Sequence, residues 1–247
     1  KIGDLLLLKG VINKKQLTSA LRKQSDEAIN YNRSVPLGKI LIEKKYVTVD
    51  EISDALNEQS QEVREEISKD LPKHSVKILL HSIAKGSLKT MNASKETMLT
   101  KQDFDITIHA MATSWYEWTQ TMIEHESFAK GARNIAFTSE GNSRVWPGYA
   151  AVSAAKSVLE ALMRNMAVEL APLKITTNCV QAGTTETPSF LAIPGSEKLI
   201  EMAKLRNPQN RLTKPEDVAN SVYLLCKKEA DWINGTILKV DGGESLR

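Results

Sequence analysis

From Ser75 onward the sequence alternates between short apolar runs and longer amphipathic stretches, and this alternation limits the possible folds more than any other feature. The run Ile78-Leu79-Leu80 is continuous, as expected for a strand that is covered on both faces of a sheet. Strands that alternate with helices form parallel sheets with helices packed on their faces. The sequence beyond residue 75 therefore predicts an α/β fold.

The first 59 residues differ in kind, because they contain an internal repeat. Segment 2–24 is echoed by segment 37–59, with an offset that relates Gly3 to Gly38. Each copy reads as a short helix, a turn and a longer helix, and such a unit buries its apolar stripe against a neighbouring copy. We therefore predict a small helical repeat domain at residues 1–59, a linker helix at 60–74 and an α/β domain at 75–247.

The longer helix of each copy carries a start signal. Asn13 and Thr48 are N-cap residue types, and Gln16 and Glu51 follow them by three residues. This pattern is a capping box, in which each side chain accepts a hydrogen bond from the backbone of the other residue. The pattern predicts that these helices begin directly after Asn13 and Thr48.

Composition narrows the classes of function. The net charge of +3 is too small to indicate a nucleic-acid partner. No apolar run approaches the length of a membrane span, and 5–8 is only a short leucine patch. Cys179 and Cys226 have no ligand-like companions, which predicts free thiols, no metal site and a reducing compartment, the cytoplasm.

The candidate catalytic residues lie in the stretch 145–162, which begins as a Pro-Gly turn and continues as a helix rich in small residues. Tyr149 and Lys156 are two helical turns apart, so both side chains face the same space. A phenol can donate a proton, and a nearby ammonium lowers the pKa of that phenol. The pair alone also fits a half-buried tyrosine beside a solvated lysine.

Several segments, taken in order, resemble the C-terminal two thirds of the short-chain dehydrogenase/reductase family, and within it the enoyl-acyl-carrier-protein reductases. Most members separate the catalytic Tyr and Lys by three residues, a position that is Val152 here. Six residues separate Tyr149 from Lys156, which is typical of the enoyl reductase branch. The matching segments are 76–84, 134–139, the Tyr149/Lys156 helix, 175–183, 211–219 and 234–243.

The resemblance implies a Rossmann-like sheet and hydride transfer from NAD(P)H to the enoyl group of an acyl thioester, as in bacterial fatty-acid synthesis. Tyr149 would donate to the thioester-enolate oxygen, Lys156 would hold the nicotinamide ribose, and Ser139 would orient the carbonyl. The family's further cofactor contacts fall on Ser82, Ile83, Ala84, Thr185 and Thr187. The family also implies a homo-oligomer, dimer or tetramer, that joins through the helix 104–126 and the Tyr149/Lys156 helix.

The sequence departs from this family at three places. The first three strands and the glycine-rich turn that holds a diphosphate have no counterpart. Glu186 stands where enoyl reductases often have arginine, and Ser139 where they commonly have a second tyrosine. The sheet is therefore expected to be truncated, with the edge of a central strand left for residues 1–59, a second chain or further sequence to cover.

Residues 1–59 resemble the N-terminal module of type II secretion and type IV pilus assembly ATPases, some of which bind cyclic di-GMP. Lys1 and Pro36 stand where the binding motifs have arginine, so the bidentate phosphate contact of arginine is not expected. Two hypotheses follow for the chain. It is either a nicotinamide-dependent enoyl reductase, or a catalytically silent reductase-like scaffold joined to a protein-interaction or cyclic-di-GMP-type module.

Two further expectations concern the first strand and the long helix. His81, at the strand end, is expected to hydrogen-bond to nearby backbone rather than to act in catalysis. The helix predicted at 104–126 carries Trp115, Tyr116 and Trp118, an aromatic cluster that favours a core or a subunit interface.

Overall fold

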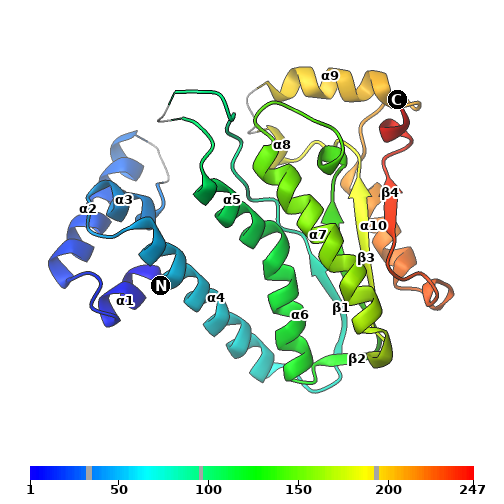
Figure 1. Cartoon of the computed structure of the whole chain (residues 1–247), viewed down its shortest axis with the longest axis horizontal. Helices are drawn as coiled ribbons and strands as arrows, with labels where there is room; N and C mark the ends of the chain where they lie inside the picture. Colours follow the sequence, from blue (N-terminus) through cyan, green and yellow to red (C-terminus); the bar gives the residue numbers. More distant parts are fainter. Residues whose placement is uncertain (32–34, 95–96, 192–194) are drawn as a thin grey trace. The chain divides into compact units, whose positions relative to one another are not determined.

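The computed structural model describes residues 1–31, 35–94, 97–191 and 195–247, which divide into two compact units, Lys1–Asp70 and Leu71–Arg247. Unit 1 consists of two short helices, each followed by a longer one (Figure 1). These helices are α1 (Ile2–Leu8), α2 (Lys14–Tyr31), α3 (Leu37–Glu43) and α4 (Val49–Asp70).

Both capping boxes predicted from the sequence are confirmed. The backbone N–H of Asn13 donates to Gln16 Oε1 at 2.8 Å, and the N–H of Gln16 donates to Asn13 Oδ1 at 3.0 Å. Thr48 N donates to Glu51 Oε2 at 2.7 Å, and Glu51 N donates to Thr48 Oγ1 at 3.2 Å. α2 and α4 begin directly after these caps, as the pattern requires.

The two helix pairs of unit 1 make corresponding close contacts. A Cβ added at Gly3 would lie 2.7 Å from Leu17 Cδ1, and one at Gly38 would lie 3.2 Å from Ile52 Cγ2. The short helix of each pair therefore approaches the long helix at a glycine. α4 runs without a break to Asp70, so the boundary expected at residue 59 and the separate linker helix expected at 60–74 fall within one helix and its end.

Unit 2 is built on four parallel strands in the order β1-β2-β3-β4 (Figure 1). The α/β fold with a parallel sheet and flanking helices is thereby confirmed. β2 begins six residues before the strand that the sequence predicted. In this added part, Gly131 has a φ of 78°, and the pairing between β2 and β1 is irregular there. The strands are β1 (Val76–His81), β2 (Phe128–Thr138), β3 (Thr176–Ala182) and β4 (Ile237–Val240).

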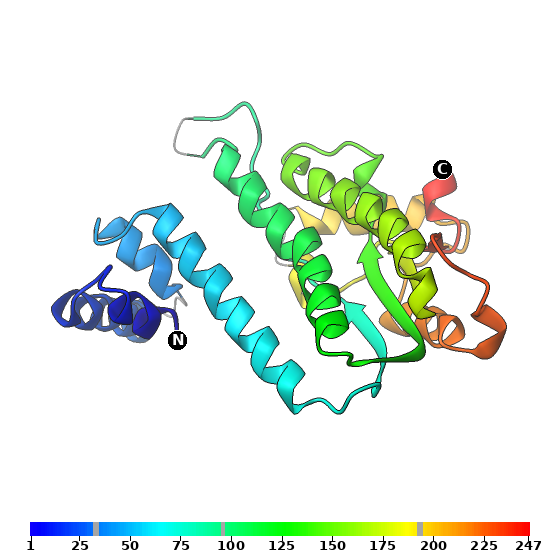
Figure 2. The ribbon, with the colours of Figure 1, turned by 60° about the horizontal axis from the view of Figure 1, so that its bottom comes forward.

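Helices cover both faces of this sheet. α6 (Ser114–Glu124) and α7 (Ala150–Glu169) pack on one face, where Trp115 is fully buried, and Figure 2 shows them side by side. α10 (Pro215–Leu225) packs on the other face through Val218 and Leu225. The shorter α8 (Pro188–Leu191) and α9 (Ser196–Arg206) follow β3.

The long helix predicted at 104–126 is interrupted. α5 (Lys101–Ile108) begins at a capping box between Thr100 and Asp103 and leads into a π-helical turn, His109–Thr113, before α6. Such a turn accommodates one extra residue within the helix. Trp115 belongs to the core, as the aromatic cluster predicted.

β1 forms one edge of the sheet, as expected for a truncated sheet, because its only partner strand among the described residues is β2. Ile78 and Leu80 are 45% and 41% exposed, since α10 covers this face only over β2, β3 and β4. Within the described ranges, no helix has the length and apolar character that crossing a bilayer requires.

Candidate active site

The four strands of unit 2 point the same way, so the loops that follow them meet at one edge of the sheet. Ser82 follows β1, Ser139 follows β2 and Gly183 follows β3. Tyr149 is the N-cap residue of α7, and Lys156 lies two turns into that helix. This carboxyl edge is where open parallel sheets bind ligands, which makes it the candidate active site.

Tyr149 is held by close packing of its ring. A Cβ added at Gly141 would overlap Tyr149 Cε1, so the ring lies against the glycine backbone. The Trp146 ring meets it edge-on, with 5.6 Å between the centroids. Burial raises the pKa of the phenol, and the nearby Ser139 hydroxyl lowers it by less. The phenol is therefore protonated at neutral pH.

Lys156 is buried, and its ammonium donates a hydrogen bond to the backbone oxygen of Phe137 at 2.7 Å. Burial lowers the pKa of Lys156 to about 8, with opposing effects from Cys179 and Glu160. The expectation that Lys156 lowers the pKa of Tyr149 is wrong for this structure, because burial dominates the phenol and the ammonium is directed at β2. A solvated lysine, the alternative interpretation of the pair, is also wrong.

The Ser139 hydroxyl is a buried polar group without a partner. Its Oγ approaches the Tyr149 phenol, but no described residue meets hydrogen-bond geometry with it. A buried hydroxyl left unpaired costs free energy that a bound polar group would recover. Ser139 therefore offers a free donor and acceptor beside Tyr149, at the position predicted from the sequence.

The other predicted contact residues divide into two groups. Ser82, Ile83 and Ala84 are exposed at the end of β1, as a ligand contact requires. Thr185 and Thr187 hydrogen-bond locally instead. Thr185 Oγ1 donates to the backbone oxygen of Gly183 at 2.9 Å, and Thr187 Oγ1 accepts from the N–H of Phe190 at 3.2 Å. These two hydroxyls shape the loop after β3.

His81 is held by a side chain rather than by nearby backbone. Its Nε2 lies 2.9 Å from Ser114 Oγ, and Ser114 Oγ donates to the backbone oxygen of Ala110 at 3.0 Å. Because the hydroxyl proton goes to Ala110, the histidine donates its Nε2–H to Ser114, and Nδ1 is left as a buried acceptor without a partner. Burial, and then the charge of Lys156, lower the pKa of His81 to about 4.

This histidine makes stability depend on pH. Its pKa is about 4 when folded and 6.5 when unfolded, so the unfolded chain binds the extra proton between these values and stability falls as pH falls through this window. We expect unfolding of unit 2 to become easier by about 2 kcal/mol between pH 8 and pH 5. Urea titrations followed by tryptophan fluorescence measure this, since all four tryptophans lie in unit 2. An equal pH slope in His81→Gln would contradict the assignment.

A charged network that sequence reasoning missed ties the loops of the site together. Arg206 Nη2 lies 2.8 Å from Glu140 Oε1 and 2.5 Å from Glu244 Oε1. Glu244 is buried, and its carboxylate accepts from the N–H and the hydroxyl of Thr184 at 3.0 and 2.7 Å. The loops after β2 and β3 are thus linked through α9 and the C-terminal turn. No motif marks these residues, because they lie far apart in the sequence.

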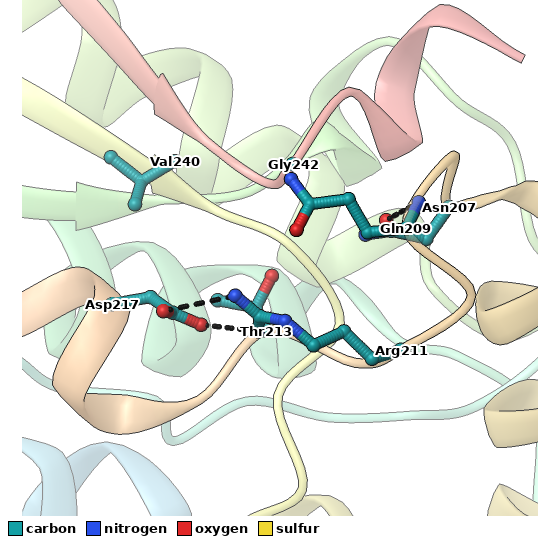
Figure 3. Close-up of a pocket in the computed structure, with 7 residues that line it drawn as sticks. All are labelled: Asn207, Gln209, Arg211, Thr213, Asp217, Val240 and Gly242. Atoms are coloured by element: carbon teal, nitrogen blue, oxygen red, sulfur yellow. Dashed lines mark hydrogen bonds and ion pairs between the residues drawn. The ribbon is translucent and has the colours of Figure 1, made fainter.

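Three described hollows lie near this edge of unit 2, and one of them, of about 420 Å³, is mostly polar and is lined by Glu140, Gln181 and Lys239 among others. A groove of about 630 Å³ borders Tyr149, and its walls are largely apolar. Its apolar lining comes from Met91, Val145, Trp146, Pro147, Ala150 and Ala154. The third hollow, a pocket of about 160 Å³, is lined mostly by polar residues. Its Arg211 guanidinium pairs with the Asp217 carboxylate at 2.6 and 3.1 Å, and Figure 3 shows this pair. The groove beside Tyr149 is the mainly apolar one of these hollows, which makes it the candidate site for an apolar substrate.

No described group of three or more His, Cys, Asp or Glu side chains is arranged to hold a metal ion. Both cysteines are free thiols. Burial raises the pKa of Cys179 to about 12, which makes this thiol unreactive at neutral pH.

The parallel sheet, its helices and the Tyr149/Lys156 edge define an oxidoreductase of the short-chain dehydrogenase/reductase type. Residues 43–245 match the family model described as Enoyl-(Acyl carrier protein) reductase. The chain belongs to this family, within the short-chain dehydrogenases/reductases. The match begins in α3, so it includes α4 as well as unit 2, and it extends beyond the resemblance at 75–247 seen in the sequence.

Individual relatives are diverse. The chain is 30% identical over 223 residues to (2S)-[(R)-hydroxy(phenyl)methyl]succinyl-CoA dehydrogenase subunit BbsD of Thauera aromatica, covering 86% of this chain and 87% of that protein. It is 38% identical over 114 residues to a short-chain type dehydrogenase/reductase of Picea abies, covering 46% of this chain and 42% of that one.

Solved structures share the fold. The enoyl-[acyl-carrier-protein] reductase (NADH) of Aquifex aeolicus aligns with a TM-score of 0.65 at 23% identity, over 77% of this chain and 72% of that chain. FabI from Candidatus Liberibacter asiaticus aligns with a TM-score of 0.64 at 22% identity, over 80% and 70% of the two chains.

Proposed function

We propose that the chain reduces the enoyl group of an acyl thioester with a nicotinamide cofactor, NADH or NADPH, as in fatty-acid synthesis. The observation that carries the proposal is the protonated, partly buried phenol of Tyr149 beside the unpaired hydroxyl of Ser139. Two such groups fit a thioester carbonyl, whose oxygen gains negative charge during reduction and accepts hydrogen bonds from both.

The residues at this edge fit the nicotinamide end of the cofactor. Lys156 supplies a buried ammonium, Ser139 an unpaired hydroxyl, and Ser82, Ile83 and Ala84 an exposed strand end. None of the described strands is followed by the glycine-rich turn that binds a diphosphate at a helix N-terminus. The cofactor would supply the hydride, and Lys156 would hold the nicotinamide ribose.

The pKa values set the roles of the two titratable groups. The raised pKa of Tyr149 keeps its proton on the phenol at neutral pH, so the residue donates to the enolate oxygen rather than acting as a base. With a pKa of about 8, Lys156 is mostly charged at pH 7 and donates hydrogen bonds. Ser139 orients the thioester carbonyl by donating a hydrogen bond from its hydroxyl.

The groove beside Tyr149 would take the apolar acyl chain. Ala154 lines this groove on α7, so Ala154→Phe should fill it. Loss of burial for two methylenes costs about 1.6 kcal/mol, which raises KM about fifteenfold for a trans-2-dodecenoyl thioester and leaves KM for a trans-2-butenoyl thioester nearly unchanged. Steady-state kinetics with both substrates test this. Ser157→Phe, at an exposed position outside the groove, is the matched control. Equal effects on both substrates would place the acyl chain elsewhere.

The experiment that tests the proposed function is calorimetric titration of the folded chain with NADH and NADPH, followed by an enoyl-thioester reduction assay. Micromolar binding with turnover supports the reductase. The absence of a glycine-rich turn among the described strands favours a second candidate, a catalytically silent reductase-like scaffold. No binding by the folded protein would favour that scaffold, and we then propose a protein partner for residues 1–59.

We also propose that residues 1–59 form a helical repeat module, related to the N-terminal module of secretion and pilus ATPases. The corresponding contacts of Gly3 with Leu17 and of Gly38 with Ile52 support two equivalent copies. A pull-down with unit 1, Lys1–Asp70, that enriches a specific protein would support an interaction role, and calorimetry with cyclic di-GMP tests the nucleotide alternative.

A further inference from the structure

Glu160 is a buried carboxylate in the candidate site that has no part in the proposed reaction. It lies on α7 one turn beyond Lys156 and is 6% exposed. Its Oε1 accepts a hydrogen bond from Thr138 Oγ1 at 2.7 Å, and its Oε2 accepts one from Asn142 Nδ2 at 2.6 Å. Both carboxylate oxygens are therefore paired, each with a different residue.

These two partners stand at the two ends of the turn that carries the site. Thr138 is the last residue of β2, and Asn142 is the last residue of a short 3-10 helix. Between them lie Ser139, whose hydroxyl is unpaired, and Gly141, against which the Tyr149 ring packs. One side chain on α7 thus fixes both ends of the turn that sets the positions of the serine and the tyrosine.

Stability alone gives little reason for a carboxylate here. Removing a charged group from water is costly, and apolar residues of similar volume in such places are often neutral or stabilising. A carboxylate differs from an apolar side chain in its directionality, because each oxygen fixes the position of its donor. Hydrogen bonds to a charged acceptor are also stronger than hydrogen bonds between two neutral groups.

We propose that Glu160 is a positioning residue, which holds the turn 138–142 so that the Ser139 hydroxyl and the Tyr149 phenol face one bound oxygen together. The catalytic consequence rests on the proposed function. The geometric part does not, because the position of the phenol can be measured without any substrate.

The geometric test is a pH titration of the five tyrosines, labelled with ¹³C at Cζ, in which the Tyr149 signal is assigned by its loss in Tyr149→Phe. In Glu160→Leu we expect the turn to loosen, the phenol to meet water and its pKa to fall from the raised value toward 10. Glu160→Gln keeps one acceptor oxygen, so the Tyr149 pKa in this variant should lie between those of the wild type and of Glu160→Leu. Gly141→Ala, which displaces the ring directly, gives the reference for a moved phenol.

Two sets of controls keep this test decisive. Glu169→Gln changes an exposed carboxylate on the same helix and should leave the Tyr149 titration unchanged. Thr138→Val and Asn142→Leu each remove one of the two hydrogen bonds, so they test the proposal even if Glu160→Leu fails to fold. Each is expected to shift the Tyr149 titration in the same direction by a smaller amount.

The catalytic test is the separation of kcat from KM. A misplaced reacting group costs about 10²-fold in rate, so we expect kcat to fall by about that factor in Glu160→Leu with KM changed by less than about threefold. A folded Glu160→Leu with the wild-type Tyr149 titration would overturn the proposal. If the wild-type chain reduces no enoyl thioester, the proposed function fails, and the tyrosine titration still decides the role of Glu160.

Discussion

Replacing Tyr149 by phenylalanine is expected to reduce enoyl-thioester turnover by about 10²- to 10⁴-fold, the usual effect of removing a general acid. The change deletes one oxygen and leaves the ring against Gly141 and Trp146, so the packing that holds the residue is retained. Because the phenol is partly buried and protonated at neutral pH, water replaces it poorly as a donor to the enolate oxygen.

The measurement is single-turnover reduction of the enoyl thioester, with thermal unfolding recorded for the same preparations. Tyr116→Phe is the matched control, because Tyr116 is 44% exposed on α6 and loses the same oxygen outside the site. Turnover that survives in Tyr149→Phe would remove this residue from the mechanism. It would leave Ser139 as the candidate donor.

The largest expected effect on stability comes from Trp115→Ala, at about 3–5 kcal/mol. Trp115 is fully buried between α6 and the sheet, and its Nε1 donates to Asn134 Oδ1 at 2.6 Å. Truncation leaves a cavity and a buried amide oxygen without its donor, and both effects lower the free energy of unfolding. Urea unfolding followed by the remaining tryptophans measures the loss within unit 2.

Trp232→Ala is the matched control, because Trp232 is 98% exposed and its removal leaves no cavity. Its effect should stay within about 0.5 kcal/mol, the usual range for a surface substitution. A similar loss in both variants would mean that the fold of unit 2 does not depend on the Trp115 contact.

The fold followed from the sequence where local signals were strong. Strand and helix alternation predicted the parallel sheet, and the capping boxes at Asn13 and Thr48 predicted where two helices begin. β2 began earlier than expected, because its first residues contain a positive-φ glycine, Gly131, and lack a continuous apolar run. The spacing of residues along the sequence therefore predicts helix starts well, but it does not predict an irregular pairing between strands.

The site was predicted only in part, for a related reason. Spacing placed Tyr149 and Lys156 on one helix, and resemblance singled out Ser139. The direction of the Tyr149 pKa depends on burial by the whole fold, which spacing does not contain. Glu160 and Arg206 act on residues many positions away in the sequence, so no short motif includes them.

The π-turn between α5 and α6 has a geometric consequence for this core. The N–H of Ser114 bonds to the oxygen of His109, which takes one residue more than an α-helical turn, and one residue rotates an α-helix by about 100°. Upstream, Thr107 accepts from the backbone of Ser87 in the loop after β1; downstream, Trp115 bonds to β2. An uninterrupted α-helix of the same length would turn one of these faces away. Gaining or losing a residue here therefore changes the angle of α6 about its axis more than it changes the length of the helix.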